Sequence, residues 1–580
     1  MDELETSRPR FGPWGWGLVV AAFAAGFWNF PLQVVGRELT HVPGDLVDNR
    51  LNLCVLEHGY RYVRGEGERF WDIGTFYPVK GVTAWSDAHI GMLPLYSGLR
   101  ACGLSPERAF QGWFLIPFAL NFAAAVWGAR RLGLGPVGAA AAAFVFTYGM
   151  PLAAQGGHSQ LVPRFLVPPA LALLWAWLRD PHRTRPLALC AACAVYQTYI
   201  SVYIGYLLVL TLAGWVLAAL ALSRGRWEWR TVLRPGGRVW AARGAAVAVA
   251  LVAVWPLVDA HRRNGSELPR DHVHTLAPRL PAWITPPGMT EYYSDLAKYT
   301  GMGSTMTGAG EEQLFPGVLP LGAVGLGTLL AVVVVCRRWT PGPVTVAAVA
   351  ALSSVALALL VTKFGPQGET WFYEPLLKIP GASGVRATSR IVLVLLFPAG
   401  VVLGVLLDRA VRCVERWRFA AAAFAALALA VVAADQRLTG ATGERSNDWW
   451  WARYPLAECV SRRTRVTEAV RAHPNPKLVY AFPAAADRIG AGGPVAMQPD
   501  IMLGVQQLGL PTANGWSGRH PVGWGFPSTY SELLAFFKAY GLSDEDLSGL
   551  VILGEPAPGP DPAFERVARA RHQPVPIPVP

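Results

Sequence analysis

The sequence predicts a mainly α, polytopic membrane helical bundle followed by a small α/β domain. Of its 580 residues, 52% are hydrophobic and 16% are charged, which leaves too little polar surface to cover a soluble globule of this size. Until about residue 435, apolar runs of about 15 to 24 residues recur, enough for about eleven spans of a bilayer. Residues 441–580 instead mix charged, apolar and Gly/Pro-rich stretches, which favours a compact α/β fold.

Arginines in the short connections set the predicted topology. The formal net charge is +12, and because the basic residues lie mainly between apolar runs, they indicate the positive-inside rule rather than nucleic-acid binding. Arg8 and Arg10 predict a cytoplasmic N-terminus, and Arg130 and Arg131 mark the next cytoplasmic connection. The first two spans and the outer loop between them are then expected at about 14–34, 107–128 and 36–106.

The later connections alternate in the same way, and a last span near 417–435 places the rest of the chain outside. We therefore expect a membrane module, 1–440, and an extracytoplasmic α/β domain, 441–580, in the inner (plasma) membrane. Within this domain, strands are expected at 477–483 and 550–554 and an amphipathic helix at 531–541. The closing "QPVPIPVP" is expected to be a disordered, polyproline-like tail.

The outer loop opens with "HVPGDLVDNRLNL", in which Asp45, Asp48 and Asn52 share one helical face. Leu53 and Leu56 fall on the other face, which predicts an interfacial helix that lies on the bilayer and presents carboxylates above it. The alternative is that Asp45 only caps the helix. Later in the loop, "IGMLPLYSGLRACGL" is too short to span and is expected to be interfacial or re-entrant.

Further along the outer loop, Asp87 and His89 follow Tyr77 and Trp85. Aromatic rings stack on the apolar face of a sugar while carboxylates bind its hydroxyls, so these four residues are candidate substrate contacts. Anchoring by an aromatic belt explains the tryptophan alone equally well.

Five more candidates lie near other outer ends of spans. His158 and Gln160 stand in "GGHSQLVPR", where a contact with lipid headgroups is the alternative. Arg386 and Arg390 stand at i and i+4, a spacing suited to a phosphate, although ordinary lipid anchoring gives the same pattern. Glu312, in "EEQLFPG", is a candidate contact that could equally complement a helix dipole.

With "FYPVKGVTAWSDAHIG", "PGASGVRATSR" and "NGWSGRHPVGW", these motifs resemble a poorly characterised bacterial branch of the type C (GT-C) membrane glycosyltransferases. The resemblance covers most of the chain through short motifs. It implies a polyprenyl-phosphate-linked sugar donor and an extracytoplasmic acceptor: a glycolipid, a polysaccharide or a protein. It also implies an acidic general base in the first outer loop. That role falls on Asp45 or Asp48, and we favour Asp45 because it follows the span end more closely.

The resulting hypothesis is a glycosyltransferase in which Arg386 and Arg390 hold the donor phosphate and an aspartate deprotonates the acceptor, with inversion at the anomeric carbon. The alternatives are a transporter or flippase of lipid-linked saccharide and a scaffold protein. Carboxylates are compatible with a divalent cation, Mg²⁺ or Mn²⁺, but do not require one, so the cofactor is left open.

Overall fold

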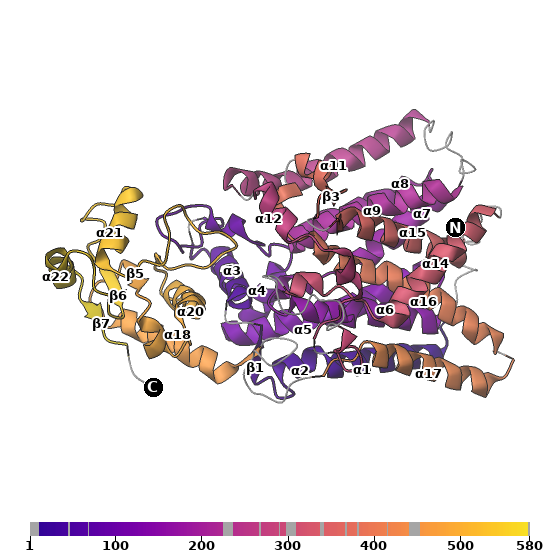
Figure 1. The fold of residues 1–580 in the computed structure, drawn as a ribbon, viewed down its shortest axis with the longest axis horizontal. Coiled ribbons are helices and arrows are strands. Elements are labelled where there is room, and N and C mark those ends of the chain that lie inside the picture. The colour runs from indigo at the N-terminus through magenta and orange to yellow at the C-terminus, as the bar shows by residue number, and fades with distance from the viewer. Residues whose placement is uncertain are drawn as a thin grey trace.

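Figure 1 shows long helices side by side along the longest axis of the molecule, with a mixed α/β segment packed against one end. The computed structural model describes residues 11–44, 47–67, 69–223, 236–265, 268–288, 290–296, 309–336, 342–365, 368–379, 382–414, 416–439 and 453–577. The helices of the bundle are α1 (Pro13–Asn29), α5 (Pro106–Arg131), α6 (Pro136–Tyr148), α7 (Val167–Arg179), α8 (Thr184–Ile200), α9 (Val202–Ser223), α11 (Gly237–Arg263), α14 (Val318–Cys336), α15 (Pro343–Val361), α16 (Val392–Cys413) and α17 (Arg418–Asp435).

Within the described ranges, nine helical stretches are long and apolar enough to cross a bilayer, which identifies a multi-pass membrane protein. The sequence predicts about eleven. The difference is α7 and α8, which have 13 and 17 residues and are shorter than the usual span of about 20.

The two ends of the bundle differ in chemistry. At one end, short connections rich in arginine join the helices, and the carboxylate of Asp408 near the end of α16 accepts hydrogen bonds from the backbone N–H of Gly135 (2.5 Å) and Gly138 (2.9 Å). We call the opposite end, which carries Tyr148 of α6 and Val392 of α16, the polar end. The segments between helices are longer here and hold most of the candidate residues of the sequence analysis.

Short elements fill the polar end. They are α2 (Pro31–Val35), β1 (His41–Pro43), α3 (Asp48–Val63), η1 (Val82–Trp85), α4 (Leu93–Ala101), η2 (Met150–Gln155), η3 (Ser159–Leu161), α12 (Arg270–Thr275), η4 (Leu280–Ile284), η5 (Ala309–Glu312), β2 (Lys363–Phe364), β3 (Thr370–Trp371), η6 (Glu374–Lys378), η7 (Ala382–Gly384) and η8 (Thr388–Ile391). Strands β2 and β3 form an antiparallel pair of their own.

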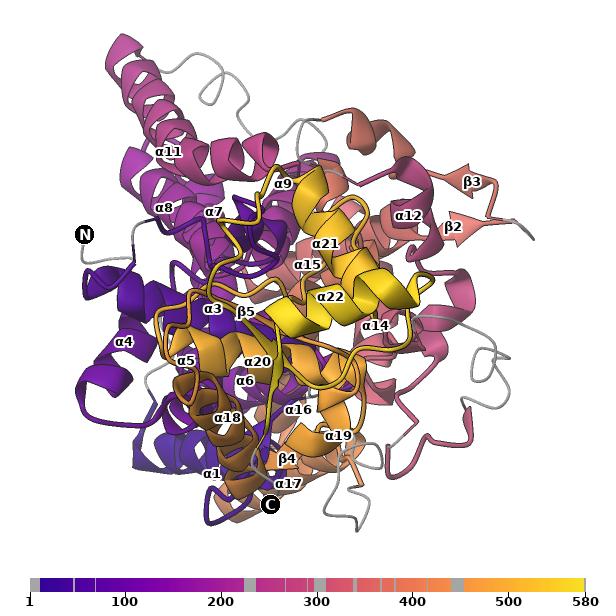
Figure 2. The same cartoon turned by 90° about the vertical axis from the view of Figure 1, so that its left-hand side faces the viewer.

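The C-terminal segment covers the polar end, and Figure 2 views the molecule from this side. Its elements are β4 (Arg453–Pro455), α18 (Leu456–Arg471), β5 (Leu478–Ala481), α19 (Ala485–Ile489), α20 (Pro494–Gln506), α21 (Tyr530–Ala539), β6 (Leu550–Leu553), α22 (Pro562–Arg571) and β7 (Pro574–Val575). Strands β5, β6 and β7 form a parallel sheet in that order. All residues of β5 and β6 are buried, as expected for a parallel sheet covered on both faces.

The predicted strands at 477–483 and 550–554 and the helix at 531–541 are confirmed by β5, β6 and α21. The predicted disorder of the tail is wrong for Pro574–Val575, which pair with Ile552 and Leu553 of β6. Proline is tolerated there because β7 is an edge strand, and Ile577 is buried in the core behind it. The predicted module boundary at 440/441 lies outside the described residues.

Helix α3 does not lie on the bilayer as the amphipathic pattern predicts. Leu53 and Leu56 are fully buried and belong to one apolar cluster with Met502 and Leu503 of α20 and Leu533 of α21. An apolar helix face that covers protein has the same sequence pattern as one that covers lipid. The C-terminal segment therefore completes the core that holds α3.

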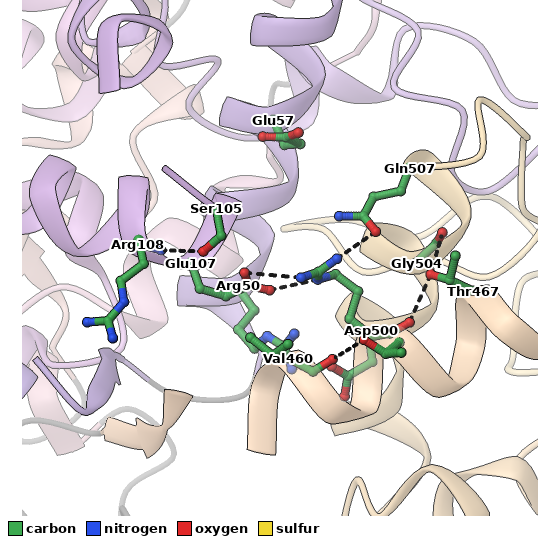
Figure 3. Close-up of polar contacts among 12 residues, drawn as sticks. Arg50, Glu57, Ser105, Glu107, Arg108, Val460, Thr467, Asp500, Gly504 and Gln507 are labelled. Carbon is green, nitrogen blue, oxygen red and sulfur yellow. Dashed lines mark hydrogen bonds and ion pairs between the residues drawn. The ribbon is translucent and has the colours of Figure 1, made fainter. Parts of the chain in front are cut away.

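Polar contacts cross this same interface (Figure 3). Arg50 of α3 forms an ion pair with Asp500 of α20, and their side chains are 2% and 0% exposed. Beside it, Arg463 of α18 donates to Glu107 of α5 (2.7 Å) and to Gln507 (2.6 Å). In addition, β1 pairs antiparallel with β4, so strands more than 400 residues apart in sequence join the two parts of the chain.

Removal of one partner of the Arg50–Asp500 pair leaves the other charge buried and uncompensated, which costs about 3–5 kcal/mol. We expect Arg50→Met to lower the midpoint of thermal unfolding in detergent by at least about 5 °C. The double variant Arg50→Met, Asp500→Leu should recover most of this loss because no buried charge remains.

The matched control is Arg64→Met, because Arg64 is 57% exposed and pairs with Glu66 at the surface. Its midpoint should change by no more than about 2 °C. If the loss of stability in the double variant equals the summed losses of the two single variants, the ion pair does not hold the interface.

Candidate functional site

A cavity of about 180 Å³ opens at the polar end between α3, α9, α11, the 384–390 segment and residues 518–519 of the C-terminal segment. Seven of the residues proposed from the sequence line it: Asp48, Trp85, Asp87, His158, Gln160, Arg386 and Arg390. They come from distant parts of the chain and meet because alternate ends of the bundle helices share this side of the molecule. Their roles in binding or catalysis stay predictions.

Asp48 begins α3, and both of its carboxylate oxygens have neighbours. Oδ1 accepts a hydrogen bond from the indole N–H of Trp516 (2.7 Å), and Oδ2 lies 3.6 Å from Nε2 of His158. The side chain is still 32% exposed. Burial and the nearby Arg390 lower the pKa of His158 to about 4, so the imidazole is neutral at neutral pH and is a weak base. We favour Asp48 as the candidate base on geometry, because its Oδ2 accepts no hydrogen bond among the described residues.

A chain of hydrogen bonds supports the cavity wall beside Asp48. The ring Nε2–H of His89 donates to the Asn52 side-chain oxygen (3.0 Å), and the Asn52 amide donates to the Gln160 oxygen (2.8 Å). Burial lowers the pKa of His89 to about 3, so the ring stays neutral. His89 itself does not line the cavity. It orients Asn52, which does, as does Gln160.

The two arginines of "GVRATSR" have different environments. Arg390 donates to one oxygen of Glu311 from Nε (3.0 Å) and Nη2 (2.7 Å), while the other oxygen accepts from Ser389 (2.6 Å). Although burial alone would raise the pKa of Glu311, Arg390 holds it below the usual value. Arg386 lines the same cavity without a carboxylate partner within the described ranges.

Glu312, the glutamate chosen from the sequence, does not line the cavity. It lies near Lys363 and Arg279 on the other side of η5, and burial raises its pKa. Adjacent residues of a helical turn point in different directions, so only Glu311 reaches Arg390. Sequence alone gives no reason to prefer one glutamate of the pair.

Of the remaining candidates in the 36–106 loop, Asp87 and Trp85 line the cavity and Tyr77 does not. Both oxygens of Asp87 accept hydrogen bonds at the start of α9, from the Ser201 hydroxyl (2.9 Å) and the Val202 N–H (2.8 Å), and burial raises the pKa of Asp87 to about 6. Trp85 lines the cavity and donates to the Asn264 carbonyl (3.0 Å). Tyr77 does not line it and packs on the apolar cluster around α3.

Asp45, the base favoured from the sequence, lies outside the described residues. No group of three or more potential metal ligands occurs in the part of the chain that the structure describes. The neighbours of Asp48 are an indole N–H and an imidazole, which do not form the oxygen-rich set that Mg²⁺ prefers. The sequence left the cofactor open, and no chemistry below depends on a divalent cation.

Several polar lining residues were not site candidates from the sequence, among them Asn52, Arg262 at the end of α11, and Arg519 of the C-terminal segment. The motif "NGWSGRHP", which holds Arg519 and Trp516, was the available signal. Four arginines and two aspartates line the cavity, so its lining is net positive. An anionic ligand suits this lining.

The chain matches no curated protein in sequence. Among solved structures it is similar to the archaeal oligosaccharyltransferase AglB from Archaeoglobus fulgidus in complex with an inhibitory peptide and a dolichol-phosphate (12% identity, TM-score 0.45, 91% of this chain and 69% of that chain). It is also similar to the apo form of the Archaeoglobus fulgidus oligosaccharyltransferase (12% identity, TM-score 0.47, 91% of this chain and 68% of that chain). The family described as a domain of unknown function, DUF6311, matches residues 99–437, more than half of the sequence, and the chain therefore belongs to this family.

Proposed function

We propose that this chain is a membrane glycosyltransferase that moves a sugar from a polyprenyl-phosphate donor to an extracytoplasmic glycolipid, polysaccharide or protein. The observation that carries the proposal is that Asp48 and Arg386 line one cavity at the end of a bundle of apolar helices. The carboxylate can take a proton, and the arginine can bind a phosphate. In this proposal the polar end faces the extracytoplasmic side.

The surroundings of the cavity suit a donor with a lipid tail. Leu257 and Val258 of α11 line it, and only 11% of the apolar window of α11 is buried in protein. Figure 1 shows α11 along the edge of the bundle. A helix so exposed faces lipid, so an isoprenoid tail can leave the cavity beside α11 while its phosphate stays at Arg386.

The proposed reaction is a one-step displacement. The acceptor oxygen attacks the anomeric carbon as its proton moves to Asp48, and the bond from that carbon to the phosphate oxygen breaks. Polyprenyl phosphate leaves with the electron pair, and Arg386 stabilises its charge. The sugar reaches the acceptor with inverted configuration, and no covalent intermediate with the enzyme is formed.

The hydrogen bonds favour Asp48 over the other groups as the base. Burial and the nearby Arg390 disfavour the cation that His158 would become on accepting a proton, and both Asp87 oxygens are engaged by the start of α9. Asp48 keeps one oxygen that no hydrogen bond among the described residues engages, since Oδ2 is 3.6 Å from His158. That oxygen can accept a proton from a bound hydroxyl.

Asp48→Asn removes the proposed base while it keeps the side-chain shape. We expect transfer to fall about 10²- to 10⁴-fold with donor affinity unchanged. The assay uses nanodisc-embedded protein, radiolabelled polyprenyl-phosphate mannose, glucose, galactose and arabinose, and a membrane glycolipid extract as acceptor. NMR of the product should show an inverted anomeric centre.

Asp180→Asn, at the far end of the bundle, is the matched control and should keep wild-type turnover. Asp45→Asn tests the base favoured from the sequence. If Asp45→Asn abolishes transfer while Asp48→Asn retains it, the base is Asp45. Donor binding without transfer, unaffected by either change, would favour a transporter. Retained configuration would exclude the one-step displacement.

Arg386→Gln removes the arginine proposed to bind the donor phosphate. A charge-assisted hydrogen bond to phosphate is worth about 1.5–3 kcal/mol, so we expect the Kd for polyprenyl phosphate to rise about 10- to 100-fold. Arg412→Gln, at the opposite end of α16, is the control and should bind like the wild type. Equal affinity in the two variants would remove Arg386 from the donor site.

A further inference from the structure

We propose that Trp516 is a positioning residue for the base, so that the C-terminal segment takes part in the chemistry of the cavity. This inference rests on the proposed function. Its geometric basis is the hydrogen bond from the indole N–H of Trp516 to Oδ1 of Asp48 (2.7 Å). The two residues are 468 positions apart in sequence, so the bond exists only when both parts of the chain are folded together.

The indole bond makes the two oxygens of Asp48 unequal. Oδ1 is engaged as an acceptor, whereas Oδ2 lies beside His158 on the cavity wall. A carboxylate held at one oxygen loses rotation about its terminal bond, which presents the second oxygen in a fixed direction. Trp516 therefore selects Oδ2 as the oxygen that receives the proton.

Trp516 can hold Asp48 only if its own position is fixed, and the residues just before it are tightly bound. The Asn514 side chain accepts from the Ala481 N–H of β5 (2.6 Å) and donates to the Gln498 oxygen of α20 (3.1 Å). Its neighbour Gly515 donates from its backbone to the same Gln498 oxygen (3.2 Å). The segment is thus anchored on the sheet and on α20 immediately before the indole.

The same segment is also bound to the outer loop of the bundle. The Thr512 N–H donates to the Gly74 carbonyl (2.8 Å), and the Phe76 N–H donates to the Asn514 carbonyl (3.0 Å). A Cβ at Gly515 would lie 2.6 Å from the Phe76 ring, so only glycine allows this close approach. Trp516 is therefore fixed relative to both halves of the cavity wall.

The first test removes the indole N–H with Trp516→Phe. Loss of a hydrogen bond to the ionised carboxylate should move the acidic limb of the pH–rate profile upward by roughly one pH unit and lower kcat about 10-fold. KM for the donor should not change, because Trp516 is not among the residues that bind phosphate. The charged and titratable groups that line the cavity with Asp48, common to all variants, are Asp87, His158, Tyr203, His261, Arg262, Arg386, Arg390 and Arg519.

The matched control is Trp524→Phe. Trp524 lies in the same segment and is 8% exposed, and its indole N–H has no hydrogen-bond partner within the described ranges. The same chemical change there removes aromatic volume but no bond to a carboxylate. Its pH profile should match the wild type even if its thermal stability falls.

A second measurement does not need turnover. Carbodiimide couples to protonated carboxyl groups, so the pH dependence of labelling at Asp48, read by peptide mass spectrometry, reports its ionisation directly. The midpoint should rise in Trp516→Phe and stay unchanged in Trp524→Phe. If Trp516→Phe does not fold, benzothienylalanine at position 516 keeps the ring shape without the N–H and should give the same rise.

The outcomes separate the two proposals. An unchanged pH profile and labelling midpoint without the N–H overturns the positioning role, even when Asp48→Asn abolishes transfer. Wild-type protein that transfers no sugar from any of the four donors overturns the proposed function, and the positioning role with it. If removal of the indole N–H raises the labelling midpoint of Asp48 and also shifts the pH–rate profile, the result supports both the proposed function and the positioning role.

Discussion

The position of Asp48 depends on the buried ion pair between Arg50 and Asp500. Helix α3 turns three polar surfaces in three directions: Asp48 and Asn52 toward the cavity, Arg50 toward α20, and Glu57 toward α4. Because side chains repeat every 3.6 residues, a fixed direction for Arg50 also fixes the direction of the cavity residues. A buried pair gives little net stability but strongly disfavours any docking that separates its charges. The pair thus specifies the rotation of α3 about its axis.

The arginines of the cavity show a similar division between structure and binding. Arg390 has its charge matched by Glu311 and its guanidinium stacked over Tyr203, 4.7 Å from the ring centroid, so it is part of the fixed wall. Arg386 lies four residues earlier, in the non-helical segment before η8, and has no such partner among the described residues. A cation that is already neutralised gains little from an added phosphate, whereas an uncompensated one gains a full charge-assisted interaction. In the proposed function, the donor phosphate is therefore assigned to Arg386 first.

The sequence predicted the features that depend on local composition and on topology. The lengths of the apolar runs predicted the helices. Because the connections alternate between the two ends of the bundle, the sequence also predicted that Asp87, His158 and Arg386 lie at the same end. Spacing could not show that Glu311 rather than Glu312 reaches Arg390, since that depends on the turn of η5. The amphipathic pattern of α3 also could not decide whether its apolar face covers lipid or protein. Nothing in the sequence indicated that Trp516 contacts Asp48, because the two residues are far apart in the chain. The aromatic, glycine-rich motif around Trp516 did mark an unusual segment.

A transfer between a lipid-borne donor and an extracytoplasmic acceptor places the base under two geometric demands. In the proposed function, the donor reaches the cavity past α11 and the arginines of the bundle, and the C-terminal segment contributes Gly518 and Arg519 to the opposite wall. The proposed base must keep a fixed distance to the donor and to the acceptor, because a shift of about 1 Å can lower the rate about 10²-fold. Asp48 lies between them, next to His158 on the bundle side and bonded to Trp516 on the other. The β1–β4 pairing, the Arg50–Asp500 pair and the bonds of Asn514 then have a common consequence. They join the two walls of the cavity, so in the proposed function the C-terminal segment is part of the site.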